Sequence, residues 1–231
     1  MVKLYGISDS DYLEVKVLKD PVAREIQYVD INHIPFSDRD LAIDMGSARE
    51  LDLDVGCVSE ADKNTLIDFV FHKLARITFD DVKYMTAKYI GGNRNFPVTV
   101  ITKLHYFTLA LRVSSLLLSF TEKTEPGADI CENVGNYEAT PKFTITVGAS
   151  VGKTSFTIND GTRVLTYTGP AIQAGKVIVI ENWNCTYDGV EHTEYLSGDY
   201  PLIPPNQDDF KFTFANITAA EVSIKYRDTW R

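Results

Sequence analysis

The chain has 231 residues, 44% of them hydrophobic and 24% charged, a composition typical of folded globular proteins. Its length allows one large domain or two ordinary ones. The formal net charge is −9, and because such a surface repels the phosphates of nucleic acid, the composition argues against a sequence-reading DNA-binding protein.

The first half of the chain has the pattern of a β module with one helix. Short runs in which apolar and polar residues alternate, as in half-buried strands, are separated by turn-forming residues. Strands are predicted over residues 12–17, 26–31, 48–55, 75–81, 84–90, 97–102, 106–113 and 116–120. Residues 121–127 are predicted to form a linker.

Ser59 begins the one predicted helix. Serine is a preferred N-cap residue, and Glu60 and Asp62 suit the positive end of the helix dipole. Apolar residues then follow at helical spacing and predict one buried stripe: Leu66, Ile67, Val70, Phe71 and Leu74. The helix is predicted to end near His72 and Lys73, and His72 has no second catalytic residue beside it in sequence.

Several carboxylates close together in sequence raise the alternative of a metal site: Asp38, Asp40, Asp44, Asp52 and Asp54. Calcium loops need glycine-punctuated spacing that bends the chain around the ion, and these residues lack it. Carboxylates that alternate along a strand share a face but lie roughly 7 Å apart. A solvated strand face is therefore favoured for Glu50, Asp52 and Asp54, and no metal-binding residue is predicted.

The second half of the chain has the pattern of a β-sandwich. Gly135 and Asn136 are predicted to turn because both tolerate positive φ, and Pro141 suits the start of a strand. An alternating strand follows over residues 142–147, and an Asp160-Gly161 turn predicts a hairpin. Further strands or hairpins are predicted over residues 155–158, 163–167, 176–180 (buried on both faces), 186–190, 210–214 and 222–226.

Few residues suggest catalysis. Cys57, Cys131 and Cys185 are odd in number and widely spaced, which fits neither a disulfide framework nor a paired zinc motif and is typical of free thiols. An alternative places Cys131 or Cys185 as nucleophile with His192 as base and Asp199 as orienting group. That spacing matches no known nucleophile motif, so no enzyme is predicted, and no catalytic or cofactor-binding residue.

A carbohydrate-binding module is the alternative from another functional class. Trp183, Tyr187, His192 and Tyr195 lie near one another in sequence and would offer a sugar-stacking face if they shared a surface. Aromatic residues of β-sandwiches are more often core or interface residues, which favours a structural interpretation.

Three blocks of sequence carry a resemblance to a known family. They are Asn133-Val134-Gly135-Asn136-Tyr137-Glu138-Ala139-Thr140-Pro141, Leu196-Ser197-Gly198-Asp199-Tyr200-Pro201-Leu202-Ile203-Pro204-Pro205-Asn206, and Val222-Ser223-Ile224-Lys225-Tyr226-Arg227-Asp228-Thr229-Trp230-Arg231. The chain resembles the distal tail proteins (Dit) of long-tailed bacteriophages, which carry a glycine-to-proline motif, an aromatic-proline turn and a terminal Tyr-Arg-x-x-Trp at these places. Residues 47–51, the helix from Ser59 and residues 77–81 also follow the order of that family's N-terminal domain. Pro205 departs from the pattern, because the family's turn carries glycine there.

The resemblance implies a structural role and a mainly β fold. Family members form a hexameric ring at the tail tip that joins the tail tube to the baseplate or tip fibre. Residues 1–126 would form a barrel- or sandwich-like ring module with the helix, and residues 127–231 a galectin-like β-sandwich that projects as a docking platform.

The implied partners are further copies of the chain in a homo-hexamer, the tail tube protein and the tail-tip or baseplate proteins. DNA would pass through the ring without specific binding, and weak saccharide binding stays an open possibility. The expected location is the virion after assembly in the host cytoplasm. No membrane span is expected, because the longest apolar run, Phe107–Phe120, is shorter than the roughly 20 residues that a membrane helix needs.

Overall fold

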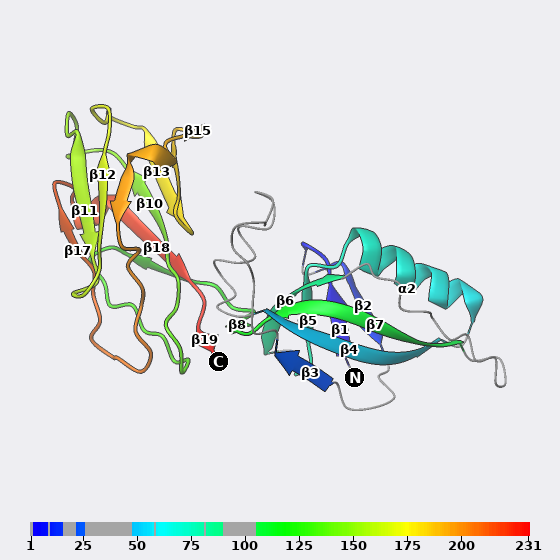
Figure 1. The fold of residues 1–231 in the computed structure, drawn as a ribbon. Coiled ribbons are helices and arrows are strands. Elements are labelled where there is room, and N and C mark those ends of the chain that lie inside the picture. Colours follow the sequence, from blue (N-terminus) through cyan, green and yellow to red (C-terminus); the bar gives the residue numbers. More distant parts are fainter. Residues whose placement is uncertain are drawn as a thin grey trace. The chain divides into compact units, whose positions relative to one another are not determined.

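The computed structural model describes residues 2–8, 10–15, 22–25, 48–57, 59–80, 82–89 and 105–231. The chain folds into two compact units, Met1–Phe120 and Thr121–Arg231 (Figure 1).

The first unit is built around one antiparallel sheet. Its strands are β1 (Val2–Tyr5), β2 (Tyr12–Val15), β3 (Val22–Glu25), β4 (Ala48–Cys57), β5 (Arg76–Thr78), β6 (Lys83–Tyr89), β7 (His105–Ser114) and β8 (Leu117–Ser119). Across the sheet the order is β2-β1-β5-β6-β7-β4-β3, and β8 pairs with the start of β6. The two long strands β4 and β7 pair along their whole length, from Ala48 opposite Ser114 to Cys57 opposite His105.

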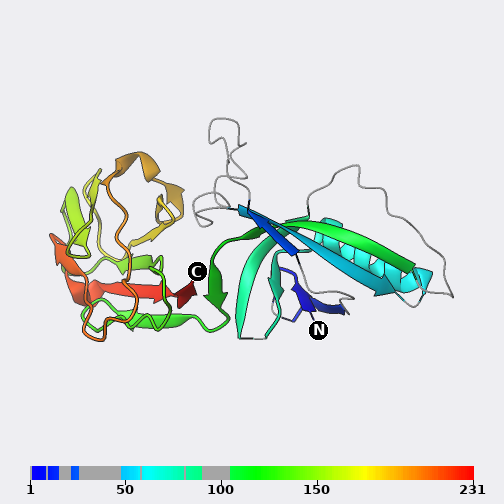
Figure 2. The same ribbon diagram turned by 60° about the horizontal axis from the view of Figure 1, so that its bottom comes forward.

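Helix α2 (Glu60–His72) lies across one face of this sheet (Figure 2). Ser59 caps it as predicted, because its hydroxyl oxygen accepts the backbone N–H of Asp62 at 3.1 Å. This bond satisfies one of the donors that a helix leaves unpaired at its first turn. At the other end the N–H of Lys73 donates to the carbonyl of Phe69, so the predicted end is also confirmed.

The buried stripe of α2 differs in part from the prediction. Leu66 and Val70 are buried as predicted, and Phe69 is buried beside them. Phe71 instead is 54% exposed and packs its ring on Tyr89, with 4.5 Å between the ring centroids. Each fully buried side chain of this size contributes about 1.5–3 kcal/mol, so the three buried residues hold the helix to the sheet.

The sheet side of this core comes from alternate residues of its strands. The alternation predicted over residues 48–55 is confirmed for Leu51 and Leu53, which are both buried. The buried strand residues are Val2, Leu4, Leu51, Leu53, Ile77, Ala87, Leu109, Leu111 and Val113. The strands predicted over residues 26–31 and 97–102, and the carboxylates Asp38, Asp40 and Asp44, lie outside the described residues.

The second unit contains two antiparallel sheets. The larger sheet has six strands in the order β15-β14-β13-β10-β18-β9, and the smaller sheet has four in the order β16-β12-β11-β17. The strands of the larger sheet are β9 (Lys123–Pro126), β10 (Lys142–Thr146), β13 (Val177–Glu181), β14 (Asn184–Tyr187), β15 (Val190–Glu191) and β18 (Val222–Tyr226). Those of the smaller sheet are β11 (Ser155–Asn159), β12 (Val164–Thr168), β16 (Leu196–Gly198) and β17 (Thr213–Ala215). Two 3₁₀ turns, η2 (Thr193–Tyr195) and η3 (Ala219–Glu221), and the short strand β19 (Thr229–Trp230) complete the unit.

The two sheets enclose one apolar core, to which both contribute every second residue. The larger sheet supplies Phe143, Ile145, Ile178, Ile180, Cys185, Val222, Ile224 and Tyr226, and the smaller sheet supplies Phe156, Ile158, Leu165 and Tyr167. Aromatic side chains line this core, and the rings of Phe156 and Tyr167, opposite each other on the smaller sheet, stack with 5.0 Å between their centroids. The predicted mainly β fold is confirmed, and α2 is the one α-helix among the described residues.

Three sequence predictions for the second unit need correction. The supposed linker over residues 121–127 contains strand β9, which pairs with β18 at the edge of the larger sheet. The run 176–180 is buried on one face only, because Ile178 and Ile180 are buried and Val177 and Val179 are half-buried.

The third correction concerns residues 210–214. Only Thr213–Ala215 form a strand, whereas Phe210 and Phe212 lie in an irregular segment and are still buried. The ring of Phe212 meets that of Phe143 edge-on at 5.1 Å. Phe210 and Phe212 are therefore buried because they anchor a loop. In sequence, such alternation of apolar and polar residues looks the same as that of a half-buried strand.

Within the described ranges no helix is long and apolar enough to cross a membrane.

Candidate functional site

The three sequence blocks that carry the family resemblance meet in the second unit. We call this place the motif junction: residues 133–141, residues 199–206 and residues 226–231. Two isolated β-bridges join the blocks, Tyr137 to Thr229 and Ala139 to Ile203. Segments about 65 to 95 positions apart thus share one hydrogen-bonded network.

Asn133 lies at the centre of the motif junction and is fully buried. Its Nδ2 donates to the carbonyl oxygens of Tyr137 at 2.7 Å and Ile203 at 3.3 Å. Its Oδ1 accepts the backbone N–H groups of Gly135 at 3.1 Å and Thr229 at 3.3 Å. One amide therefore satisfies both of its donors and both lone pairs, and it holds all three blocks together.

Gly135 is required by close packing and not by backbone conformation. A Cβ atom at this position would lie 1.8 Å from the carbonyl oxygen of Thr229. Neither Gly135 nor Asn136 has positive φ, so the prediction that these two residues form a turn with positive φ was wrong. Glycine lets the backbone of the terminal block approach closely enough to form the bridge between Tyr137 and Thr229.

The terminal block is fixed by a buried charge. Asp228, whose side chain is 8% exposed, accepts from the Lys123 ammonium at 2.9 Å and from the Val134 N–H at 3.1 Å. Lys123 also donates to the carbonyl of Glu132 at 2.7 Å. The Tyr226 hydroxyl bonds both the N–H and the carbonyl of Glu132. Strand β9 and the terminal block therefore both form hydrogen bonds to the same short segment, Glu132 to Val134.

The chain end continues this contact. The N–H of Arg231 donates to the side-chain oxygen of Asn136 at 2.8 Å, and the Arg231 guanidinium lies 5.7 Å from the ring centroid of Tyr137. These exposed contacts are individually weak.

A second charged group links the smaller sheet to the motif junction. The Asp160 side chain is 3% exposed and accepts the N–H groups of Leu202 at 2.9 Å and Arg163 at 2.7 Å. Burial alone would raise the pKa of Asp160, but these bonds, one from Thr162 and the Arg163 charge together lower it. Arg163 in turn binds Glu138 at 2.7 Å, an ion pair that raises the pKa of the guanidinium.

The structure of the turn around Pro205 explains how the chain accommodates its one departure from the family pattern. Positive φ occurs at Asn206, where φ is 54°, and not at Pro205. Asparagine tolerates this conformation better than most residues. The N–H of Asn206 also donates to the carbonyl of Asn133 at 2.9 Å, which anchors the turn to the motif junction. The tight turn is thus kept although glycine is absent.

The cysteine, histidine and aspartate alternative is not assembled. Cys131 and Cys185 are fully buried, and burial together with nearby carboxylates raises the pKa of each thiol to about 12. His192 directs Nδ1 to the hydroxyl of Tyr167 at 3.0 Å, and Asp199 is exposed. A thiol with this pKa supplies almost no thiolate near neutral pH. His72 is exposed and pairs with Asp68 at 3.0 Å.

The four residues of the aromatic alternative do not form one face. Tyr187, His192 and Tyr195 do cluster, with ring centroids 5.3 Å apart for Tyr187 and His192 and 5.0 Å apart for His192 and Tyr195. Trp183 makes its ring contact with Tyr200, at 5.8 Å. All four residues are half-buried. Among the residues with described side chains, no group of three or more His, Cys, Asp or Glu has metal-site geometry.

Several residues that form the motif junction or bind to it were not predicted from the sequence. Lys123 and Asp160 lie outside the recognised blocks, and nothing in their local sequence distinguishes them from surface charges. Asp228 and Asn133 lie inside the blocks, and this position was the one sequence signal that marked them. Their burial becomes apparent only in the fold.

Comparison with known proteins supports the resemblance at the level of the fold. No protein-family model matches the chain, and no curated protein does. Among solved structures, the chain is similar to the crystal structure of the SPP1 Dit protein (gp 19.1), described as a paradigm of the hub adsorption apparatus in phages that infect Gram-positive bacteria. The TM-score is 0.54 at 15% sequence identity, and the match covers 100% of both chains. The chain therefore has the fold of a phage distal tail protein.

Proposed function

We propose that this chain is a non-enzymatic structural protein of a phage tail tip. In this role it forms a hexameric ring that joins the tail tube to the baseplate or tip fibre and serves as a docking hub. The observation that carries the proposal is the match to the SPP1 Dit protein, which extends over the whole of both chains. A match that covers both units is stronger support than a likeness of the β-sandwich alone, because β-sandwiches host many functions.

The motif junction supports the same proposal. The three family-like blocks converge on the buried Asn133 and supply hydrogen bonds to it, as expected of residues retained for architecture. The thiols of Cys131 and Cys185 are buried and protonated, which agrees with a role without catalysis.

The two units take different roles in the proposal. The first unit, with its long β4–β7 pair and helix α2, forms the ring. The second unit, the sandwich, projects from it and docks other tail proteins. In the first unit the sheet ends at β2 and β3, each paired on one side among the described residues. A closed heterologous ring can pair such edges between neighbouring copies. The acidic segment Asp38–Asp44 is a further candidate for ring contacts, as are other strands of the first unit.

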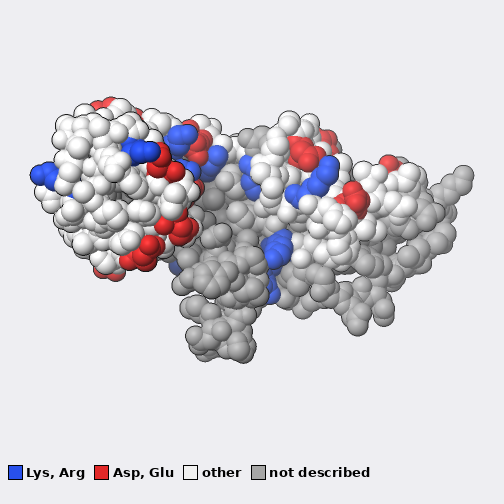
Figure 3. Space-filling view, turned by 90° about the horizontal axis from the view of Figure 1, so that it is seen from above, with Lys and Arg blue, Asp and Glu red and all other residues white. Residues whose placement is uncertain are grey.

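A ring of this chain would let DNA pass without gripping it. The net charge of −9 repels phosphates at ordinary salt. In the view of Figure 3 the described basic side chains are scattered among acidic ones and form no broad basic surface. The proposed location is the virion tail tip, after assembly in the host cytoplasm.

Light scattering coupled to size exclusion tests the ring directly. The full chain is expected to elute with a mass near six times its 25.9 kDa, with larger values if two rings stack. A strictly monomeric mass at the highest concentration that stays soluble would contradict the proposal.

A further inference from the structure

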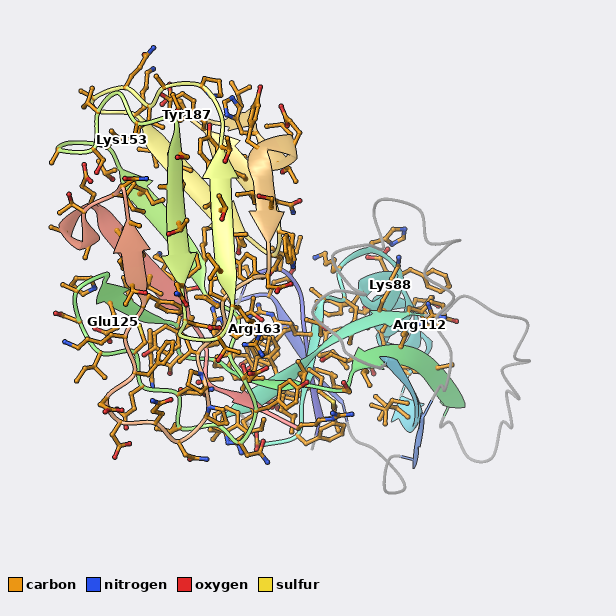
Figure 4. All side chains as sticks on the ribbon, turned by 60° about the vertical axis from the view of Figure 1, so that its left-hand side comes forward. Lys88, Arg112, Glu125, Lys153, Arg163 and Tyr187 are labelled. Atoms are coloured by element: carbon orange, nitrogen blue, oxygen red, sulfur yellow. The ribbon has the colours of Figure 1, made fainter. Side chains whose placement is uncertain are left out.

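The outer face of the smaller sheet in the second unit is made almost entirely of small uncharged residues. We call it the hydroxyl face. Strands β11 and β12 lie side by side there. In Figure 4, Lys153 lies near one end of this pair of strands and Arg163 near the other. The outward residues are Ser155, Thr157, Asn159, Val164, Thr166, Thr168, Ser197, Thr213 and Ala215. None of them is charged or aromatic, and six of the nine carry a hydroxyl.

The register places these hydroxyls in rows across the sheet. Thr157 lies opposite Thr166, and Thr166 lies opposite Ser197. Ser155 lies opposite Thr168 in the next row. Neighbouring strands are about 4.8 Å apart and successive outward residues about 6.6 Å apart, so the hydroxyls are regularly spaced across the sheet.

Most of these hydroxyls have no hydrogen-bond partner in the part of the chain that the structure describes. Ser197 and Thr213 donate to backbone carbonyls at 3.5 Å and 3.4 Å. The side-chain hydroxyls of Ser155, Thr157, Thr166 and Thr168 make no hydrogen bond to another described residue, although their backbones pair within the sheet. Since each hydroxyl offers one donor and two acceptor lone pairs, this surface is open to hydrogen bonding with a ligand.

The composition of the hydroxyl face excludes several kinds of partner. It lacks the lysine and arginine that phosphates and nucleic acids require. It lacks the aromatic and arginine anchors on which protein interfaces depend, and serine and threonine are under-represented among such anchors. It is too polar for a lipid surface. Sugar hydroxyls, by contrast, can both donate hydrogen bonds to protein hydroxyls and accept them. Binding of a neutral glycan would also desolvate no charged side chain of this face.

We propose that the hydroxyl face binds a neutral polysaccharide. This site is distinct from the cluster of Tyr187, His192 and Tyr195, and the inference does not rest on the tail-tip proposal. Binding by one face is weak, because every hydrogen bond gained replaces one to water. It becomes effective when several copies of the chain, or several repeats of the glycan, engage together.

Native gel electrophoresis in the presence of a neutral polymer suits such weak binding. The acidic chain migrates while dextran, galactomannan or glucomannan cast into the gel does not, so binding appears as retardation. The test variant is Thr157→Val with Thr166→Val, which removes two hydroxyls, keeps the charge and retains β-branched residues suited to strands. The matched control is Thr144→Val with Thr186→Val on the larger sheet, where both residues are half-buried and flank Val179 in register.

The proposal expects retardation of the wild-type chain by at least one of the three polymers. The test variant should weaken the apparent affinity about fivefold or more, because two hydrogen bonds are lost. The control variant and Trp183→Ala should migrate like the wild type. The proposal is overturned if no polymer retards the chain, or if the test variant is retarded as strongly as the wild type. It is also overturned if the test variant changes only the oligomeric state, which would make this face a protein interface.

Discussion

The carbonyl oxygen of Thr229 occupies the space that a side chain on Gly135 would need, 1.8 Å from an ideal Cβ position. Residues near the start and at the end of the second unit are therefore fitted to one another. This fit explains why a glycine is needed at a place where the backbone conformation itself does not demand one.

Gly135→Ala should destabilise the second unit by about 1–3 kcal/mol or more, because the added methyl group meets rigid backbone. Urea unfolding followed by fluorescence measures the loss. Gly148→Ala is the matched control, since its Cβ would lie 3.4 Å from a side-chain oxygen of Glu221, an ordinary contact. Equal unfolding midpoints for the two variants would show that the contact with Thr229 relaxes without cost.

Asn133→Ala should lower the free energy of unfolding by about 2–4 kcal/mol, because four backbone groups each lose a hydrogen bond inside the protein. Asn184→Ala serves as the control, since Asn184 is exposed on β14. Its effect should stay within about 0.5 kcal/mol, as for most surface substitutions. A similar small effect for both variants would mean that water replaces the Asn133 amide.

Removal of residues 228–231 should lower the melting temperature by at least about 5 °C. The deletion leaves Lys123 without the Asp228 carboxylate and removes the bridge between Tyr137 and Thr229. Differential scanning calorimetry measures the shift, and Arg231→Ala should change it much less because its contacts are exposed. An unchanged melting temperature after the deletion would contradict the clamping role of the terminal block.

Stability should fall in acid through Glu221. Burial alone would raise the pKa of this carboxylate, but hydrogen bonds from Ser150, Gly148 and Thr218 lower it from 4.5 to about 2. A pKa lowered by folding contributes stability that is present above pH 4.5 and is lost as the pH falls toward about 2. The free energy of unfolding should therefore rise with pH across this window.

Urea unfolding at several pH values tests the effect of Glu221. Glu221→Gln should flatten the dependence, and Ser150→Ala should reduce it while keeping the carboxylate. A slope that is the same in Glu221→Gln as in the wild type would assign the acid sensitivity to other groups.

Local pattern predicted the elements of the fold well where burial is periodic. The N-cap at Ser59, the burial of Leu51 and Leu53 in β4 and the alternating burial along β18 all follow from side chains within a few residues of one another. The errors arose where tertiary contacts decide. The stretch 121–127 looked like a linker, but its pairing with β18 is set by a strand almost 100 positions away.

The motif junction could be predicted only in outline. The resemblance marked the three blocks, yet the residue that joins them is an asparagine of unremarkable local sequence. A buried polar residue has no periodic signature, because its stability comes from partners that only the fold supplies. The same holds for Asp160, whose bond to Leu202 spans two distant loops.

Electron microscopy of the purified full chain, negatively stained across a range of concentrations, tests the central proposal most directly. The account predicts ring-shaped particles whose class averages show six-fold symmetry around an open channel. Single compact particles of one chain at every concentration, or closed particles without a channel, would contradict it.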